Sequence, residues 1–346
     1  MPLLDICHVT TYRYRQPVAF GEHRMMLRPR EGHDQRLVEA RLDITPAPAE
    51  LRWVHDVFGN SVAVARFSGR ARELRFESRV RLDHRPLNAL DFQIEDYAAT
   101  FPFSYGMEEM PDLARSIERH YADPDHAVDR WARQFLRLEG REAGTFDLLS
   151  AMTHAVKRDL TYVARHERGI QDPATTLRLG SGTCRDFAVL MIEAARSLGL
   201  AARFVSGYLY SPARDGGGHV GGGSTHAWVR VYLPGAGWVE FDPTNGIVGN
   251  RDLIRVAVTR DPGQALPLHG TWTGFPSDSL GMTVEVSVIS APSDEAAPRA
   301  AGAAAATDAA ERAGGAGAAP PGGAGTELTT EAAPSPRRNR IERRPS

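Results

Sequence analysis

The sequence has very few of the residues that build disulfide scaffolds or membrane spans. Only two cysteines, Cys7 and Cys184, occur among its 346 residues, too few for a disulfide framework. The longest unbroken apolar run, residues 187–192, is far shorter than the roughly 20 residues of a transmembrane helix. The first residues show no basic segment followed by an apolar stretch, so no secretion signal is predicted. We therefore expect a cytoplasmic protein that does not cross a membrane.

An excess of charge of one sign is also missing. The chain carries 41 Lys and Arg against 43 Asp and Glu, a net charge of −2. General binders of nucleic acid or membrane surfaces normally carry a large positive excess, so neither partner is predicted. Lys157 is the only lysine, and we interpret the predominance of arginine as genomic base-composition bias.

Composition and periodicity divide the chain into three parts, residues 1–100, 101–290 and 291–346. The last part has no aromatic residue and no valine, and Leu328 and Ile341 are its only large aliphatic residues. Such a segment buries too little apolar surface to offset the entropy of ordering it. We expect it to be a disordered tail rich in Ala, Gly and Pro.

The first part has the pattern of β-strands and turns. Runs of β-branched and aromatic residues that alternate with polar ones predict strands at 6–14, 38–44, 61–67 and 73–82. Proline after the second run and the turn signal at 56–60 separate them. The first part is therefore expected to form a β-rich domain, an antiparallel sheet or sandwich.

From residue 125 the apolar residues recur at helical spacing, and a third helix begins at Cys184. Thr183 is a suitable N-cap for that helix, and Asp186 at its third position can complete a capping box. Gly199 marks the end of the helix. Strands at 203–210, 227–233 and 238–242 follow, which makes the second part α+β.

Cys184 is the first candidate for chemistry, because it stands at the first position of a buried helix. The unpaired N–H groups and the dipole of a helix N-terminus favour a thiolate, and the same groups can stabilise an oxyanion. A lone cysteine in a helix is nevertheless more often a small buried apolar residue than a nucleophile.

His226 and Asp242 strengthen that candidate if the strands that carry them pair in one particular register. Placing Arg230 opposite Glu240 sets opposite charges against each other and gathers the valines and Phe241 on the other face. His226 and Asp242 then become diagonal neighbours within hydrogen-bond reach. With Cys184 they would form a nucleophile, a base and an orienting acid. The competing interpretation is a surface histidine beside a surface aspartate. For Asp242 we expect an orienting role and no place in the core.

Three further features bear on the same site. Tyr162 is a candidate oxyanion donor only because a phenol donates a hydrogen bond, and its position favours a core tyrosine. The glycine-rich segment 216–223 precedes His226 and lacks the Lys-Ser/Thr ending of a phosphate loop; it is either a gating flap or a tolerated insertion. No calcium-loop or zinc pattern is present, so no metal and no cofactor are predicted.

Four ordered motifs resemble the bacterial transglutaminase-like family. They are Gly-Thr-Cys-Arg-Asp at 182–186, Arg-Phe-Val-Ser-Gly-Tyr at 203–208, Thr-His-Ala-Trp at 225–228 and Gly-Trp-Val-Glu-Phe-Asp-Pro-Thr-Asn at 237–245. The likeness is strong over residues 150–246. The β-rich start, with Leu-Arg-Pro-Arg at 27–30 and Asp-Val-Phe-Gly-Asn at 56–60, is similar to the amino-terminal domain that accompanies this core.

The resemblance implies a papain-like α+β core, with a cysteine-bearing helix on an antiparallel sheet, and a Cys184–His226–Asp242 triad. It implies acyl transfer or hydrolysis of a peptide or isopeptide amide through a thioester, as in transglutaminase-like cysteine peptidases. Cross-linking by protein-glutamine amine transfer, and a non-catalytic peptide-binding module, are the alternatives. Some relatives accompany ATP-grasp peptide ligases, which makes such modules expected partners. The calcium dependence of animal cross-linking enzymes is not carried over.

Overall fold

The amino-terminal sheet is built around one long strand. The computed structural model describes residues 3–86, 93–164, 169–210 and 223–290. In this part of the chain, strand β1 (Leu3–Met25) buries every second residue along its first half, as expected for a strand with one face on a core. The antiparallel sheet has the order β2-β5-β1-β4-β3, with β2 Gln35–Thr45, β3 Glu50–His55, β4 Ser61–Arg66 and β5 Arg70–His84.

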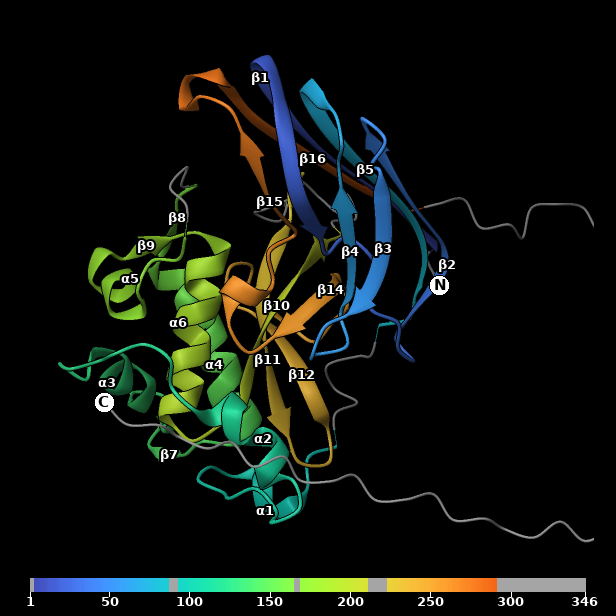
Figure 1. Ribbon diagram of the computed structural model, residues 1–346. Helices are drawn as coiled ribbons and strands as arrows, with labels where there is room; N and C mark the ends of the chain where they lie inside the picture. Colours follow the sequence, from blue (N-terminus) through green and yellow to red (C-terminus); the bar gives the residue numbers. More distant parts are fainter. Residues whose placement is uncertain (1–2, 87–92, 165–168, 211–222, 291–346) are drawn as a thin grey trace, which may run out of the picture. The chain divides into compact units, whose positions relative to one another are not determined.

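Two strands from the end of the described chain complete that same sheet (Figure 1). Strands β15 (Leu268–Thr273) and β16 (Ser279–Ser290) both pair antiparallel with β1. The sequence predicts these residues within the second part, 101–290, and in the structure they pair with the first strand of the chain. Strand β16 pairs with the first half of β1, and β15 pairs with its second half. The last strands of the described chain therefore belong to the amino-terminal sheet and connect the two parts.

The second sheet is the antiparallel sheet that the hairpin pattern predicts. Its order is β13-β12-β11-β10-β14, and its strands are β10 Ala202–Leu209, β11 His226–Leu233, β12 Gly237–Asp242, β13 Ile247–Val248 and β14 Leu253–Thr259. Arg230 lies opposite Glu240 and Val229 opposite Phe241. The predicted register is therefore confirmed.

Helices cover one face of the second sheet, which makes the fold α+β as expected. Figure 1 shows α6 (Cys184–Ser197) and α4 (Thr145–Asp159) beside β10, β11 and β12. Phe187 and Leu190 of α6 are buried in one cluster with Val229 and Phe241 of the sheet. The other elements are α1 Asp96–Ala99, α2 Met110–Ile117, α3 Ala127–Arg133, α5 Pro173–Leu179, β6 Arg137–Leu138, β7 Arg141–Glu142, β8 Thr161–Tyr162, β9 Ser181–Gly182, and the 3-10 turns η2 Pro262–Gln264 and η3 Pro276–Asp278.

Both ends of α6 are fixed as the sequence predicts. The Thr183 side chain accepts from the Asp186 backbone, and the Asp186 carboxylate accepts from the Thr183 backbone at 2.8 Å, a complete capping box. Gly199 follows the C-cap with φ +81°, a conformation that glycine adopts without strain.

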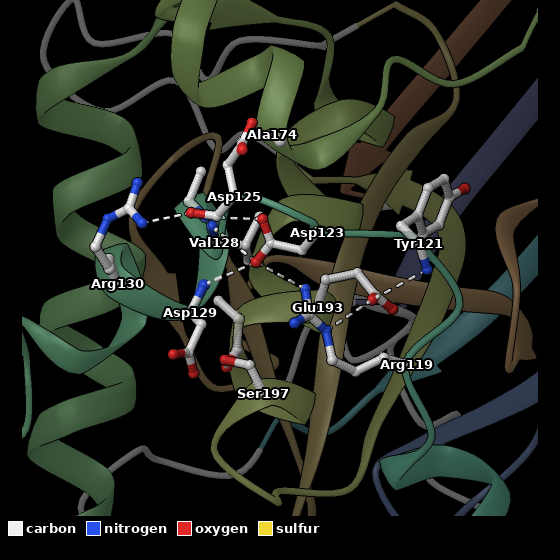
Figure 2. A network of polar contacts seen from close by, with 12 residues as sticks. Arg119, Tyr121, Asp123, Asp125, Val128, Asp129, Arg130, Ala174, Glu193 and Ser197 are labelled. Atoms are coloured by element: carbon white, nitrogen blue, oxygen red, sulfur yellow. Dashed lines mark hydrogen bonds and ion pairs between the residues drawn. The ribbon is translucent and has the colours of Figure 1, made fainter.

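A buried carboxylate anchors the middle of α6 to the chain before α3 (Figure 2). Glu193 is fully buried and accepts from the backbone N–H groups of His120 and Tyr121 and from Arg196. Asp123 in turn accepts from the first N–H groups of α3 and from Arg119. Because every one of these contacts joins an ionised group to a donor, the network fixes α6 relative to the preceding loop.

A buried ion-pair network joins the chain just before β2 of the amino-terminal sheet to the second sheet. All described residues belong to one compact unit, Met1–Ala296. Asp34, which precedes β2, pairs with Arg255 of β14 at 2.5 Å, and Arg255 also contacts Glu240 of β12 at 3.0 Å. Burial raises the pKa of Asp34, but the Arg255 guanidinium outweighs it and lowers that pKa to about 2. The Asp34 carboxylate therefore stays ionised although it is buried.

The glycine-rich segment 216–222 and the tail 291–346 lie outside the described residues. Within the described ranges, no helix is long and apolar enough to cross a membrane.

We predict that Asp34→Ala lowers the free energy of unfolding by about 2 kcal/mol, because Arg255 keeps Glu240 but loses the buried carboxylate that accepts from both of its terminal nitrogens. Urea unfolding at pH 7 measures the change. Asp5→Ala is the matched control: Asp5 pairs with Arg81 in an exposed position, where the loss of the pair costs less than about 1 kcal/mol. Equal losses in the two variants would contradict a structural role for the buried network.

Candidate active site

Cys184 occupies the first position of α6, as the sequence predicts. Its side chain is 8% exposed, and it forms no disulfide. The helix that it begins runs for 14 residues and is buried over most of its length. The thiol therefore lies at the positive end of a long, fixed helix dipole.

His226 and Asp242 meet as the predicted register requires. The imidazole Nε2 lies 2.8 Å from the Asp242 carboxylate oxygen Oδ2. His226 is 1% exposed and Asp242 is fully buried. The expectation that Asp242 stands outside the core was wrong: it is fully buried at the end of β12, and the two turn residues Thr244 and Asn245 that donate to it are buried as well. The interpretation as a surface pair is excluded on the same ground.

Two neighbours of Asp242 complete its hydrogen bonding. The backbone N–H of Thr244 donates to Oδ1 at 3.0 Å, and the side-chain amide of Asn245 donates to Oδ2 at 2.8 Å. A buried carboxylate needs such donors to stay ionised. Sequence reasoning missed Asn245, although an aspartate followed by a turn is a common signal for local bonds to its carboxylate.

The ionisation of His226 and Asp242 is coupled. Burial lowers the pKa of the imidazole, but the charge of Asp242, the hydrogen bond to it and the Cys184 thiol together raise that pKa to about 10. Burial raises the pKa of Asp242, and the His226 charge, with the donors named above, lowers it below its ordinary value. The pair is therefore an imidazolium and a carboxylate at neutral pH.

The second ring nitrogen of His226 is the one available to Cys184. Nδ1 is buried and has no hydrogen-bond partner of normal geometry among the described residues, yet the thiol lies close enough to raise the pKa of the ring. The indole of Trp228 stacks beside the imidazole, with ring centroids 6.0 Å apart and planes 28° from parallel. Sequence reasoning did not assign a role to Trp228, although it stands two residues from His226 on the same strand face.

Tyr162 lies next to the cysteine through a short parallel pairing. Strand β8 pairs with β9 so that Tyr162 stands opposite Gly182, two residues before Cys184. Burial raises the pKa of Tyr162, and the charge of Cys184 adds to that rise. A phenol with a raised pKa stays protonated and can donate a hydrogen bond. Tyr162 is thus close enough to the thiol to be kept as an oxyanion candidate.

The arrangement brings together the groups needed for nucleophilic catalysis at a carbonyl. It contains a thiol at a helix N-terminus, an imidazole fixed by a carboxylate, and hydrogen-bond donors beside the thiol. Within the described part of the chain, no three His, Cys, Asp or Glu side chains gather as a metal site requires.

We predict that the His226–Asp242 pair stabilises the fold less as pH rises. The pKa of His226 is raised from 6.5 to about 10, so its stabilising effect is complete below pH 6.5 and is lost as pH rises through about 10. In a Cys184→Ala background, which removes thiol titration, Asp242 still raises the pKa of the ring. There, His226→Gln should reduce the free energy of unfolding by more at pH 6 than at pH 9, because the ion pair is lost as the ring deprotonates. Urea unfolding at both pH values measures this, and an equal effect at both would contradict the ion pair.

The chain matches two family profiles. Residues 4–83 match the bacterial transglutaminase-like N-terminal region, and residues 130–243 match the transglutaminase-like superfamily. The first match covers the strands of the amino-terminal sheet up to β5, and the second contains Cys184, His226 and Asp242. Together the two matches cover more than half of the chain.

Two similar proteins match over very different lengths of the chain. An uncharacterized protein of Mycobacterium tuberculosis is 29% identical over 299 residues, which cover 81% of this chain and 91% of that protein. A protein-glutamine gamma-glutamyltransferase of Pseudomonas aeruginosa is 34% identical over 73 residues, 20% of this chain and 11% of that protein.

A solved structure shares the fold over most of its length. The protein from Cytophaga hutchinsonii, described as a candidate cysteine protease, superposes with a TM-score of 0.60 at 18% sequence identity and covers 84% of this chain and 92% of that one. At this identity the likeness establishes the fold alone. The two profile matches assign residues 130–243 to the transglutaminase-like superfamily and residues 4–83 to the bacterial transglutaminase-like N-terminal region.

Proposed function

We propose that this protein is a thiol enzyme that hydrolyses or transfers the acyl group of a peptide or isopeptide amide. The observation that carries the proposal is the 2.8 Å contact between His226 Nε2 and Asp242, which fixes the imidazole and leaves Nδ1 for the Cys184 thiol. Membership of the superfamily and the fold of the Cytophaga hutchinsonii protein support the same general chemistry.

The reaction would proceed in two steps that conserve protons. The Cys184 thiolate attacks the amide carbon, the oxyanion is held by N–H groups of the α6 N-terminus and by the Tyr162 hydroxyl, and the His226 imidazolium gives its proton to the departing amine. A thioester on Cys184 remains. Neutral His226 then takes a proton from water or an amine as that acceptor attacks the thioester, and the thiolate is restored.

Water and amine acceptors define the two outcomes, and we place hydrolysis first. The second candidate is protein-glutamine amine transfer. It is supported by the similarity, over 73 residues, to the Pseudomonas aeruginosa enzyme. A third, a non-catalytic peptide-binding module on the same fold, is disfavoured because Cys184, His226 and Asp242 are all retained and the last two are hydrogen bonded.

We predict that iodoacetamide labels Cys184 rapidly at pH 6 and that His226→Ala abolishes this fast labelling, since the imidazolium partner stabilises the thiolate. Mass spectrometry from pH 5 to 9 measures the rates, and Cys7 in the same chain is the internal reference. Labelling that rises only near pH 8.5, the ordinary range of a thiol, would contradict an activated nucleophile.

We further predict that products formed from a peptide library identify the acyl acceptor as water or a primary amine. Incubation with and without a primary amine such as glycine ethyl ester should give cleaved amides in both samples if the enzyme is a hydrolase, and amine-coupled glutamine if it is a transferase. Both products should be absent with Cys184→Ala, because no thioester forms. Turnover by Cys184→Ala at the rate of the native protein would overturn the proposal.

A further inference from the structure

Asn245 contacts both members of the buried His226–Asp242 pair. It lies in the turn that follows β12, and its side chain is largely buried. Its amide Nδ2 donates to Asp242 Oδ2 at 2.8 Å and lies 3.4 Å from His226 Nε2. The same carboxylate oxygen therefore accepts from the imidazole and from the amide.

The only lysine of the chain holds the backbone of that turn. Lys157, near the end of α4, donates from Nζ to the Asn245 carbonyl at 2.7 Å. The backbone N–H of Gly246 closes the turn on the Asp242 carbonyl at 2.8 Å. Gly246 has φ +67°, and a Cβ there would meet the Lys157 stem at 2.9 Å. The turn is thus fixed by a charged hydrogen bond at one residue and by close packing at the next.

We propose that Asn245 is a positioning residue for His226 and Asp242, and that Lys157 acts through it by fixing its backbone. This inference rests on the proposed function, since it concerns how the imidazole is presented to Cys184. It assigns a role to two residues that lie outside the expected triad.

The geometry explains why an amide suits this place. The Asp242 carboxylate has Oδ1 fixed by the Thr244 N–H and Oδ2 shared by two donors, so its plane cannot rotate without breaking a bond. An amide N–H donates but does not titrate, so it cannot take the proton that His226 carries. With the carboxylate fixed, the ring keeps Nε2 on Asp242 and Nδ1 toward the thiol.

The charged and titratable groups that act on the His226 ring are Asp242 and Cys184, and His226 is the charged group that acts on Asp242. The Lys157 ammonium donates to a backbone carbonyl, so its effect on the pair is expected to be geometric. Removing the ammonium while keeping the stem, as in Lys157→Met, therefore tests the positioning role.

The experiment compares the iodoacetamide rate at Cys184 from pH 5 to 9 in the full-length native protein, Asn245→Ala, Asn245→Ser and Lys157→Met. We expect the rate at pH 6, relative to Cys7, to fall about fivefold in each variant, the effect of one lost hydrogen bond. The pH at which the rate reaches half its maximum should also move toward that of an ordinary thiol. Arg158→Met is the matched control, because Arg158 is the next residue on α4 and pairs with Asp159 in an exposed position; it should label as the native protein does.

Thermal unfolding of each variant separates positioning from loss of fold. A rate and pH profile equal to those of the native protein in folded Asn245→Ala, or in folded Asn245→Ser if the alanine variant unfolds, would overturn the inference. Slow labelling of the native protein itself at pH 6 would instead overturn the proposed function. The two failures are therefore distinguishable in one set of measurements.

Discussion

The ionised carboxylate of Asp242 is the constraint around which the site is arranged. A fully buried carboxylate is costly unless donors surround it, and here an imidazole, a backbone N–H and a side-chain amide do so. The donors come from two parts of the chain: His226 at the start of β11, and Thr244 and Asn245 in the turn after β12. The carboxylate therefore determines where the strand end, the turn and the ring must lie.

The position of Cys184 is set separately, by helix α6. Helix α6 is fixed by a capping box at its first turn and by Glu193 at its middle, and it packs on the same sheet that carries His226 and Asp242. Because α6 packs on the sheet that carries His226 and Asp242, this packing sets the position of the thiol relative to the imidazole. This precision is what nucleophilic catalysis requires of its scaffold.

The amino-terminal sheet is part of this scaffold. Its strand β1 binds β15 and β16 from the end of the described chain, and Asp34 pairs through Arg255 with Glu240. Glu240 precedes Asp242 by two residues on β12. The buried network thus connects the amino-terminal region to the strand that carries the catalytic candidate, and an apolar cluster with residues of both sheets, including Leu4, Ile6, Tyr208 and Ile254, supports the joint.

The sequence by itself determined the local features, and tertiary structure decided the rest. The helix start at Thr183 and Cys184 follows from capping chemistry, and the β11–β12 register follows from charge pairing and apolar alternation; both depend on residues close together in the chain. The burial of Asp242, the contact of Lys157 with Asn245 and the return of β15 and β16 to β1 could not be predicted in this way. The last two depend on pairings across 88 residues or more, for which neither periodicity nor local hydrogen bonding leaves a signal, because many distant partners satisfy the same pattern.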